Sequence, residues 1–222
     1  MARFKNREKA GQALAEIFSK KAYADPVVLA LPRGGVPVAI ELVRVLRAPM
    51  DLIMVRKIGA PGQPELAVAA VVNGDDPQFV VNSGIARSFG LSDDDIKAMS
   101  RSELEEIRRR RDVYLKGRAS VPVKGRTVIV VDDGIATGAT IRASLKALRL
   151  RSPARLVLAV PVAPAEMITA LQDEVDEIIC LETPAPFTAI GVHYRDFAQT
   201  SDAEVTSLMD EAAAFAATQR KP

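Results

Sequence analysis

The stretch from Val128 to Thr140 limits more than any other what this chain can fold into. Its first four residues, Val128 to Val131, are all β-branched and predict a fully buried strand. Two adjacent carboxylates, Asp132 and Asp133, follow where this strand ends, and a turn of small residues leads into a helix predicted from Ile141 to Leu150. A strand, an acidic pair, a tight turn and a helix in this order predict a βα unit with a binding site at the turn.

The turn has the composition of a phosphate cradle. Backbone N–H groups at the start of a helix have no partner within the helix, and their dipoles favour an anion. Thr137 and Thr140 add hydroxyl donors, and Gly138 lets the backbone approach a phosphate closely. Because the two carboxylates would repel a phosphate at the same spot, they suit hydroxyls or a metal about one sugar away. A phosphorylated ribose with Mg²⁺ meets both demands.

These residues resemble the phosphoribosyl pyrophosphate (PRPP) motif of type I phosphoribosyltransferases. The resemblance implies that Asp132 and Asp133 bind the ribose hydroxyls and that the following loop binds the 5′-phosphate. The implied PRPP-binding residues of the loop are Gly134, Ala136, Thr137, Gly138, Ala139 and Thr140. An ordinary Asp-Gly turn before a capped helix is the alternative. It explains Asp133-Gly134 but neither the second carboxylate nor the spacing of Thr-Gly-Ala-Thr.

A second strand–turn–helix unit lies nearer the N-terminus. Val27 to Leu31 predicts a buried strand, and Pro32-Arg33-Gly34-Gly35 leads into a helix from about Val36 to Arg47. A Gly-Gly turn alone is a weak signal, but beside the first motif it resembles the pyrophosphate-binding loop of the same family. The resemblance implies that Arg33, Gly34 and Gly35 bind PRPP. It also predicts a cis non-proline peptide bond, expected at Arg33–Gly34.

A third strand is predicted from Asp51 to Val55, ending in Arg56-Lys57. The residues from Ile58 to Glu65 are rich in glycine and proline, and they predict a mobile loop. Arg-Lys-Ile-Gly-Ala-Pro-Gly is similar to the lead into the catalytic loop of adenine-type phosphoribosyltransferases. This similarity implies three catalytic residues, Arg56 and Lys57 at the pyrophosphate and Glu65 at the incoming nucleophile. The alternative is an ordinary hairpin with exposed charges.

An insertion is expected from about residue 58 to residue 120. Two strands, Leu66 to Val72 and Gln78 to Val81, predict a hairpin with its turn at residues 73–77. Ser92 opens a capping box and one long helix to about Lys116. The basic run Arg108 to Arg111 is compensated by Glu105 and Glu106 at i,i+4 spacing, which favours a solvated helix over a nucleic-acid surface. One of these arginines could reach the active site from the side.

Strands and helices alternate along the rest of the chain, with further strands from Arg155 to Val160 and from Glu177 to Leu181. The alternation predicts a doubly wound, mainly parallel α/β sheet, in one domain over residues 1–222. Helices are expected at both ends, from Lys5 to Lys20 and after Ser201. Ligands of such sheets bind at the carboxyl ends of the strands, where the two glycine loops, Arg56-Lys57 and the acidic pair are all predicted to lie.

An aromatic, irregular segment at about residues 183–200 corresponds to the hood that binds the base in the family. The resemblance implies that Phe187 stacks on the base and that Tyr194 or Phe197 frames its pocket. The resemblance also implies that Asp196 contacts the metal or the pyrophosphate, which makes it a candidate metal ligand with Asp132 and Asp133.

Length and composition place the chain among globular proteins. Its 222 residues are 48% hydrophobic, which suffices for a sizeable core. No apolar run reaches the ~18–20 residues of a membrane span, and no apolar signal core follows the N-terminus. The net charge of +2 gives no support for a nucleic-acid surface, and the single cysteine, Cys180, cannot form an internal disulfide. A cytoplasmic protein without nucleic-acid or membrane partners is expected, and the family resemblance implies a homodimer.

The resemblance implies a glycosyltransferase of the pentosyltransferase class. It would transfer the phosphoribosyl group of PRPP to a nitrogenous base and release pyrophosphate, with Mg²⁺ as cofactor. Ala136 stands where hypoxanthine–guanine enzymes carry an acidic residue and adenine enzymes carry alanine, so the acceptor stays open. Two alternatives are a PRPP-binding regulator without transferase activity and an enzyme acting on another phosphorylated sugar.

Overall fold

A computed structural model of the chain describes residues 2–73 and 77–218. At its centre lies a five-stranded sheet in which all neighbouring strands are parallel, in the order β2-β1-β6-β7-β8. The strands are β1 (Pro26–Ala30), β2 (Met50–Leu52), β6 (Thr127–Val131), β7 (Arg155–Val162) and β8 (Glu177–Glu182). The predicted mainly parallel α/β sheet is confirmed.

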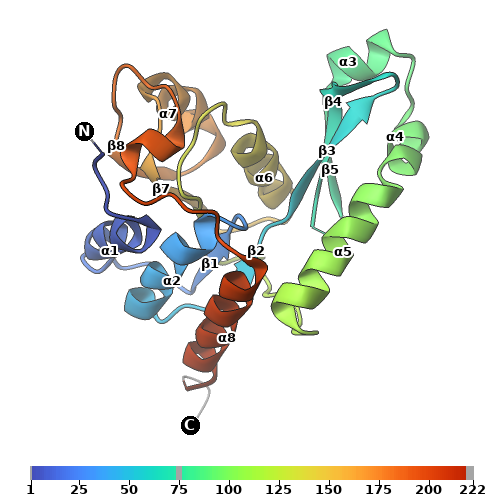
Figure 1. The fold of residues 1–222 in the computed structure, drawn as a ribbon. Helices are drawn as coiled ribbons and strands as arrows, with labels where there is room; N and C mark the ends of the chain where they lie inside the picture. Colours follow the sequence, from blue (N-terminus) through green and yellow to red (C-terminus); the bar gives the residue numbers. More distant parts are fainter. Residues whose placement is uncertain (1, 74–76, 219–222) are drawn as a thin grey trace.

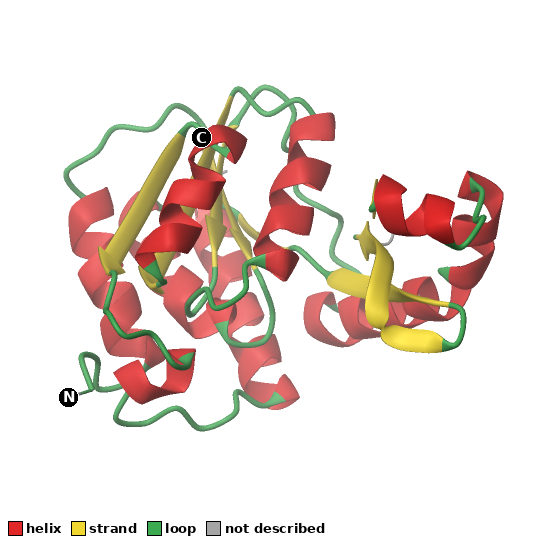
Figure 2. Ribbon diagram, turned by 90° about the horizontal axis from the view of Figure 1, so that it is seen from above, coloured by secondary structure: helices red, strands yellow, loops and turns green. Residues whose placement is uncertain are grey.

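Helices cover both faces of this sheet, as Figures 1 and 2 show. On one face lie α1 (Arg7–Phe18), α2 (Gly35–Leu46) and α8 (Asp202–Thr218). On the other lie α6 (Ala139–Leu150) and α7 (Ala165–Leu171), the latter followed by the 3₁₀ turn η1 (Gln172–Glu174). Alternate residues of one strand enter the two cores, since Val28 packs on the α1 side and Val27 on the α6 side. Burial on both faces explains why the strands are continuous apolar runs in the sequence.

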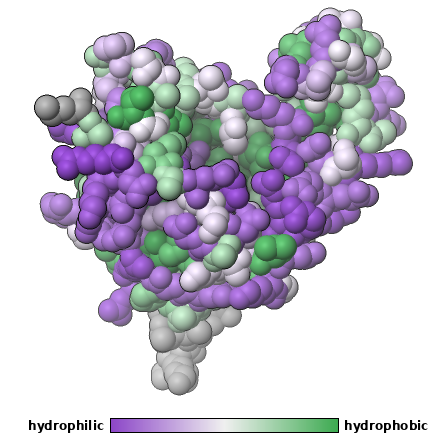
Figure 3. Space-filling view, in the orientation of Figure 1, coloured by the Kyte–Doolittle hydropathy of each residue, from purple (hydrophilic) through white to green (hydrophobic). Residues whose placement is uncertain are grey.

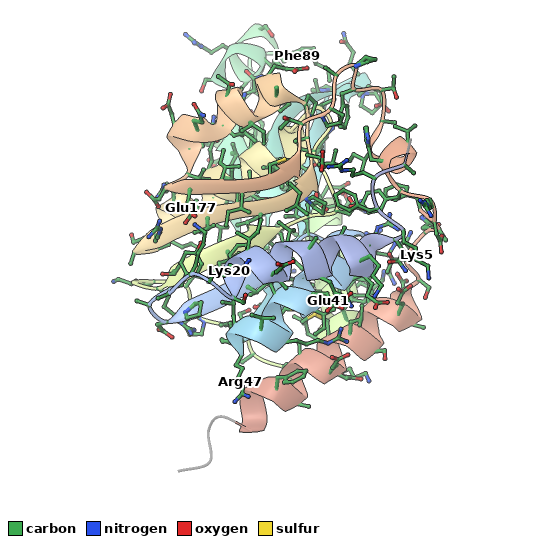
Figure 4. The ribbon with its side chains drawn as sticks, turned by 90° about the vertical axis from the view of Figure 1, so that its left-hand side faces the viewer. Lys5, Lys20, Glu41, Arg47, Phe89 and Glu177 are labelled. Atoms are coloured by element: carbon green, nitrogen blue, oxygen red, sulfur yellow. The ribbon has the colours of Figure 1, made fainter. Side chains whose placement is uncertain are left out.

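The first two helices pack closely against each other. Figure 4 shows α1, between the labels of Lys5 and Lys20, lying along α2, on which Glu41 is labelled. A Cβ atom at Gly11 would stand 2.7 Å from the carbonyl oxygen of Val38, so only glycine permits this approach. None of the described helices is both long and apolar enough to cross a bilayer.

A separate lobe stands beside the main sheet, on the right in Figure 1. It is an antiparallel sheet of β3 (Val55–Ala60), β4 (Gln63–Val72) and β5 (Gln78–Val81). The lobe also contains three helices, α3 (Ser83–Ser88), α4 (Asp93–Met99) and α5 (Arg101–Leu115). Of these, α3 packs on β4, α5 packs on β3, and α4 contacts α5. The predicted pair of strands from Leu66 and from Gln78 is confirmed, while part of the predicted turn between them, 74–76, lies outside the described residues.

Three predictions for the segment from Asp51 to Glu65 are wrong. The strand expected from Asp51 to Val55 is the short β2 and the start of β3, because the chain leaves the parallel sheet at Ile53. Arg56 and Lys57 therefore lie inside an antiparallel strand and not past the end of a parallel one. The expected mobile loop from Ile58 to Glu65 is a hairpin, which pairs Ala60 with Gln63. Gly62 has a φ of +73°, which allows the tight turn.

The expected long helix after Ser92 is two helices. The capping box of Ser92 and Asp95 is present at the start of α4. The helix breaks at Ser100, which is fully buried and whose hydroxyl donates to the carbonyl of Lys97. Periodicity is the same on both sides of this break, so pattern alone does not reveal it. The short helix α3 is an addition to the predicted elements.

A buried ion pair joins the lobe to the edge of the main sheet. Asp51 of β2 and Arg111 of α5 are each less than a tenth exposed, with Oδ1 and Nη1 3.7 Å apart. The carboxylate also accepts the backbone N–H groups of Leu52, at 2.7 Å, and Val121, at 2.9 Å. Burial raises the pKa of Asp51, while the charge of Arg111 and the two N–H groups oppose this rise.

Replacing Asp51 by alanine should lower the free energy of unfolding by about 3–5 kcal/mol, because Arg111 would be left buried without its counter-charge. Urea denaturation followed by circular dichroism measures this change. Asp112→Ala, at an exposed position of the same helix, is the matched control and should change stability by less than about 0.5 kcal/mol. Equal effects of the two substitutions would contradict the role given to the buried pair.

Candidate active site

The carboxyl ends of β1 and β6 lie side by side because these strands are neighbours, with Ala30 opposite Val131. The N–H group of Leu31 donates to the carbonyl of Val131 at 2.9 Å, which extends the pairing into the loops. A Cβ atom at Gly34 would stand 2.1 Å from Oδ2 of Asp133, and one at Gly35 would stand 2.6 Å from the carbonyl oxygen of Val131. The two predicted binding loops are therefore in direct contact, which only glycine permits.

The first loop differs from its prediction in one detail. The cis non-proline peptide bond joins Pro32 to Arg33, one position before the expected Arg33–Gly34 bond. The sequence pattern places the loop, but it does not distinguish the two peptide bonds that flank Arg33. The Arg33 side chain is about one-third exposed, and its Nη1 lies 3.3 Å from Oδ1 of Asp202 at the start of α8.

The acidic pair follows β6 as predicted. Oδ1 of Asp132 accepts the backbone N–H group of Asp133 at 2.9 Å. Burial raises the pKa of Asp132 well above its usual range, and the negative charge of Asp133 raises it further. Burial also raises the pKa of Asp133, which is 8% exposed, while a hydrogen bond from Arg7 opposes the rise. A cation or hydroxyl donors placed at the pair would offset this loss of solvation and the repulsion between the two carboxylates.

Arg7, in the first turn of α1, is a site residue that the sequence pattern did not reveal. Its Nε donates to Oδ2 of Asp133 at 2.7 Å, and its Nη1 donates to the carbonyl of Ala198 at 2.7 Å. The guanidinium carbon lies 3.8 Å from the ring centroid of Phe197. Arg7 thus connects the N-terminal segment, the acidic pair and the hood. Nothing in its local sequence signals this role, because all its partners are distant along the chain.

The predicted phosphate loop leads into an open helix start. Helix α6 begins at Ala139, its N-cap is Gly138, and no side chain caps it. Ala136, Thr137, Ala139 and Thr140 are all exposed. The loop is anchored by the N–H group of Ile135, which donates to the carbonyl of Val162. Gly138 has a φ of +71°, and a Cβ atom there would stand 2.2 Å from Cε of Met167. This arrangement can accept an anion at the N–H groups of α6.

Gly134 completes the same loop. A Cβ atom at this position would stand 2.8 Å from Cγ2 of Ile190 in the hood. The hood is irregular as expected, apart from the 3₁₀ turn η2 (Ile190–His193).

The hood side chains take different positions. Phe187 is half-buried and stacks on His193, with ring centroids 5.2 Å apart. Tyr194 is only 5% exposed, and its hydroxyl donates to the carbonyl of Asp133 at 2.6 Å. This buried ring packs against Phe4 and Phe197, supports the acidic pair through its hydroxyl and leaves little open surface. Asp196 is exposed and lines a cavity of about 260 Å³ beside Arg7.

The three candidate residues of the lobe are not in contact with the acidic pair in the described part of the chain. Nε of Arg56 lies 3.3 Å from Glu103, and its Nη2 lies 3.7 Å from Glu106. Lys57 and Glu65 are exposed on β3 and β4. The molecular surface is hollowed between the lobe and the main body, as Figure 3 shows.

Within residues 2–73 and 77–218, no group of three or more histidine, cysteine or acidic side chains is placed to hold a metal ion. Asp132 and Asp133 are two adjacent carboxylate donors, so a divalent cation here would take further oxygen ligands from substrate or water. Such a donor set fits Mg²⁺, which keeps several waters.

Three comparisons relate this chain to known proteins. The model of the phosphoribosyl transferase domain family matches residues 3–196. The crystal structure of TT1426 from Thermus thermophilus is 38% identical, covers 94% of this chain and 98% of its own, and superposes with a TM-score of 0.81. A Mycobacterium tuberculosis protein, "Putative phosphoribosyl transferase Rv0571c", is 43% identical over 212 residues. That match covers 96% of this chain but 47% of the relative, so the chain spans about half the relative's length.

Gly35→Ala should lower the free energy of unfolding by about 1–3 kcal/mol, because the added Cβ would collide with the backbone of β6. Thermal unfolding measures the effect. Gly84→Ala in α3 is the control, since its Cβ would have 3.5 Å to the nearest atom, and it should shift stability by no more than about 1 kcal/mol. A Gly35 variant as stable as the Gly84 variant would show that the loops do not touch.

Proposed function

This chain belongs to the phosphoribosyltransferase family, and on that premise we propose that it transfers the phosphoribosyl group of PRPP to a nitrogenous base, releasing pyrophosphate. The observation that carries the proposal is the contact between the Gly34 loop and Asp133. This contact brings a cationic loop, two carboxylates and an uncapped helix start to one edge of the sheet. PRPP offers one group to each of these features. Its pyrophosphate suits the cationic loop, its ribose hydroxyls suit the carboxylates, and its 5′-phosphate suits the helix start.

Each group of PRPP has a proposed partner. Asp132 and Asp133 accept hydrogen bonds from the ribose hydroxyls, since ionised carboxylates are strong acceptors. The N–H groups at the start of α6, with Thr137 and Thr140, bind the 5′-phosphate. Arg33 binds the pyrophosphate, and the glycines beside it let the backbone approach the same group.

Mg²⁺ is the proposed cofactor. Asp132 and Asp133 would hold it directly or through water. Asp196 of the hood is a further proposed contact, although within the described residues it forms no three-member metal-binding group with the pair. When bound, the ion supplies positive charge to the leaving group and orients the sugar diphosphate.

Catalysis would depend on positioning and charge. Displacement at C1 of the ribose passes through a transition state of oxocarbenium character, in which negative charge gathers on the pyrophosphate. Arg33 stabilises that charge from the main body, and Arg56 and Lys57 do so from the lobe. Glu65 is the proposed acidic group for the incoming nucleophile, which requires the β3–β4 hairpin to approach the cleft.

One observation favours the alternative of a PRPP-binding regulator. Arg56 is paired with Glu103 and Glu106 and is thus not turned to the acidic pair. Release of pyrophosphate from PRPP in the presence of nucleobases distinguishes a transferase from a regulator. An enzyme for another phosphorylated sugar would not need Arg33, Gly34 and Gly35, all of which lie at the site.

The acceptor is proposed to bind beneath the hood, against Phe187. A cytoplasmic location is proposed because the single cysteine indicates no disulfide framework. A homodimer and the absence of nucleic-acid and membrane partners are further proposals. They rest on the family resemblance and the balanced charge.

Asp133→Asn should weaken Mg²⁺-dependent PRPP binding about tenfold or more, because the ribose hydroxyls lose a charged acceptor. Isothermal titration with PRPP, with and without Mg²⁺, measures the affinity. Asp94→Asn is the control, since this side chain is 94% exposed in α4, and its affinity should match that of the wild type. Unchanged affinity of the Asp133 variant would contradict the proposed site.

Phe187→Ala should raise the KM for the base about three- to tenfold through loss of stacking, while the KM for PRPP changes less. Steady-state release of pyrophosphate with the base that supports turnover gives both values. Equal losses for the two substrates would remove Phe187 from the base pocket.

A further inference from the structure

Four polar side chains form a line along one face of α5. They are Glu103, Glu106, Arg110 and Tyr114, which we call the α5 line. Spacings of three and four residues place side chains on the same side of a helix. This face is turned toward β3 and the start of α8, because the partners of the line belong to those elements.

The two ends of the α5 line hold the two arginines that the proposed function assigns to the leaving group. At one end, Glu103 and Glu106 lie 3.3 Å and 3.7 Å from the guanidinium of Arg56. At the other end, the hydroxyl of Tyr114 donates to Oδ1 of Asp202 at 2.6 Å, and Arg33 lies 3.3 Å from the same oxygen. A single helix of the lobe thus connects the main-body cation with the lobe cation.

Arg110 stands between these ends. Its Nε donates to Oε1 of Glu106 at 2.6 Å, and its side chain is 35% exposed. Burial and the bond to Asp202 raise the pKa of Tyr114 to about 12, and the charges of Arg110 and Arg33 both oppose this rise. The hydrogen bond from Tyr114 lowers the pKa of Asp202, and the charges of Arg33 and Arg110 lower it further. Arg110 from the lobe and Arg33 from the main body therefore act on the same hydrogen bond.

Carboxylates compensate these cations in the present structure. Asp202 faces Arg33, and Glu103 and Glu106 face Arg56 and Arg110. Glu106 has a further partner in Arg109, which bonds both of its carboxylate oxygens at 2.7 Å and 3.0 Å. Because Arg109, which is 62% exposed, holds both oxygens, Glu106 would keep a counter-charge if Arg110 bound another anion. Arg110 can therefore exchange Glu106 for another anion without leaving this carboxylate unpaired.

We propose that Arg110 is a third arginine ligand for the diphosphate group, beside Arg33 and Arg56, and that the α5 line forms the side of the leaving-group site that the lobe contributes. The inference rests on the proposed function and deepens it. Diphosphate carries more charge than a carboxylate and accepts bidentate hydrogen bonds from a guanidinium. Diphosphate therefore competes with Glu106 for Arg110 and Arg56. Because both arginines belong to the lobe, their binding to a diphosphate held by Arg33 would move the lobe toward the main body.

Isothermal titration with inorganic diphosphate and Mg²⁺ tests this inference. Arg110→Gln should weaken binding about tenfold or more, because a charge-assisted bond is lost. Arg108→Gln removes the same charge from an exposed position outside the α5 line and should change the affinity less than about twofold. Equal effects of the two substitutions, or no effect of Arg110→Gln, would overturn the inference.

Glu106→Gln gives a prediction of opposite sign. It removes the carboxylate that competes for Arg110 and Arg56, so diphosphate should bind several-fold more tightly. If Glu106 only supports the helix, binding should weaken together with the midpoint of thermal unfolding. Weaker binding in a variant that unfolds at the wild-type temperature would also contradict the competition.

Ribose 5-phosphate separates failure of this inference from failure of the proposed function. It carries the ribose hydroxyls and the 5′-phosphate but no diphosphate, so Arg110→Gln should leave its affinity unchanged. Wild-type binding of ribose 5-phosphate, with diphosphate binding that does not depend on Arg110, would overturn this inference alone. Binding of neither compound to the wild type would overturn both.

Discussion

The contact between Gly34 and the carboxylate of Asp133 is the constraint on which the site depends. It exists because β1 and β6 are neighbouring parallel strands, so that the loops after them begin side by side at the same edge of the sheet. Side chains larger than hydrogen at Gly34 or Gly35 would separate the loops. A ligand that spans a cationic loop and a carboxylate pair can therefore be held without movement of the main sheet.

Charge compensation is the second theme of the structure. Burial disfavours the ionised forms of Asp132 and Asp133, and Arg7 from α1 supplies the opposing charge. Because Arg7 also donates a hydrogen bond to the carbonyl of Ala198, the N-terminal segment and the hood are both linked to the acidic pair. On the lobe, carboxylates hold Arg56 and Arg110 in the same manner. These arginines and Arg33 are thus each paired with a carboxylate in this structure.

The sequence predicted the main sheet and its two loops well, because their signals are local. β-branched runs, paired glycines and the Asp132-Asp133 step each indicate a structure over a few residues. The lobe was predicted less well. The glycine- and proline-rich segment from Ile58 to Glu65 fits both a mobile loop and a tight hairpin. It is a hairpin because β3 pairs with β4, which the local pattern does not reveal. The break at Ser100 likewise depends on burial of its side chain, which periodicity does not express.

The sequence by itself determined the parallel α/β core and the chemistry of its two loops, because strand propensity and turn chemistry act between near neighbours. Only the tertiary structure decided which distant charges meet. Arg7 reaches Asp133, Tyr114 reaches Asp202, and Arg56 faces α5, although none of these pairs shares a local pattern. Such pairings arise because packing of whole helices brings together side chains that are far apart in the sequence. Of these three pairs, only that of Arg7 and Asp133 is also largely removed from water.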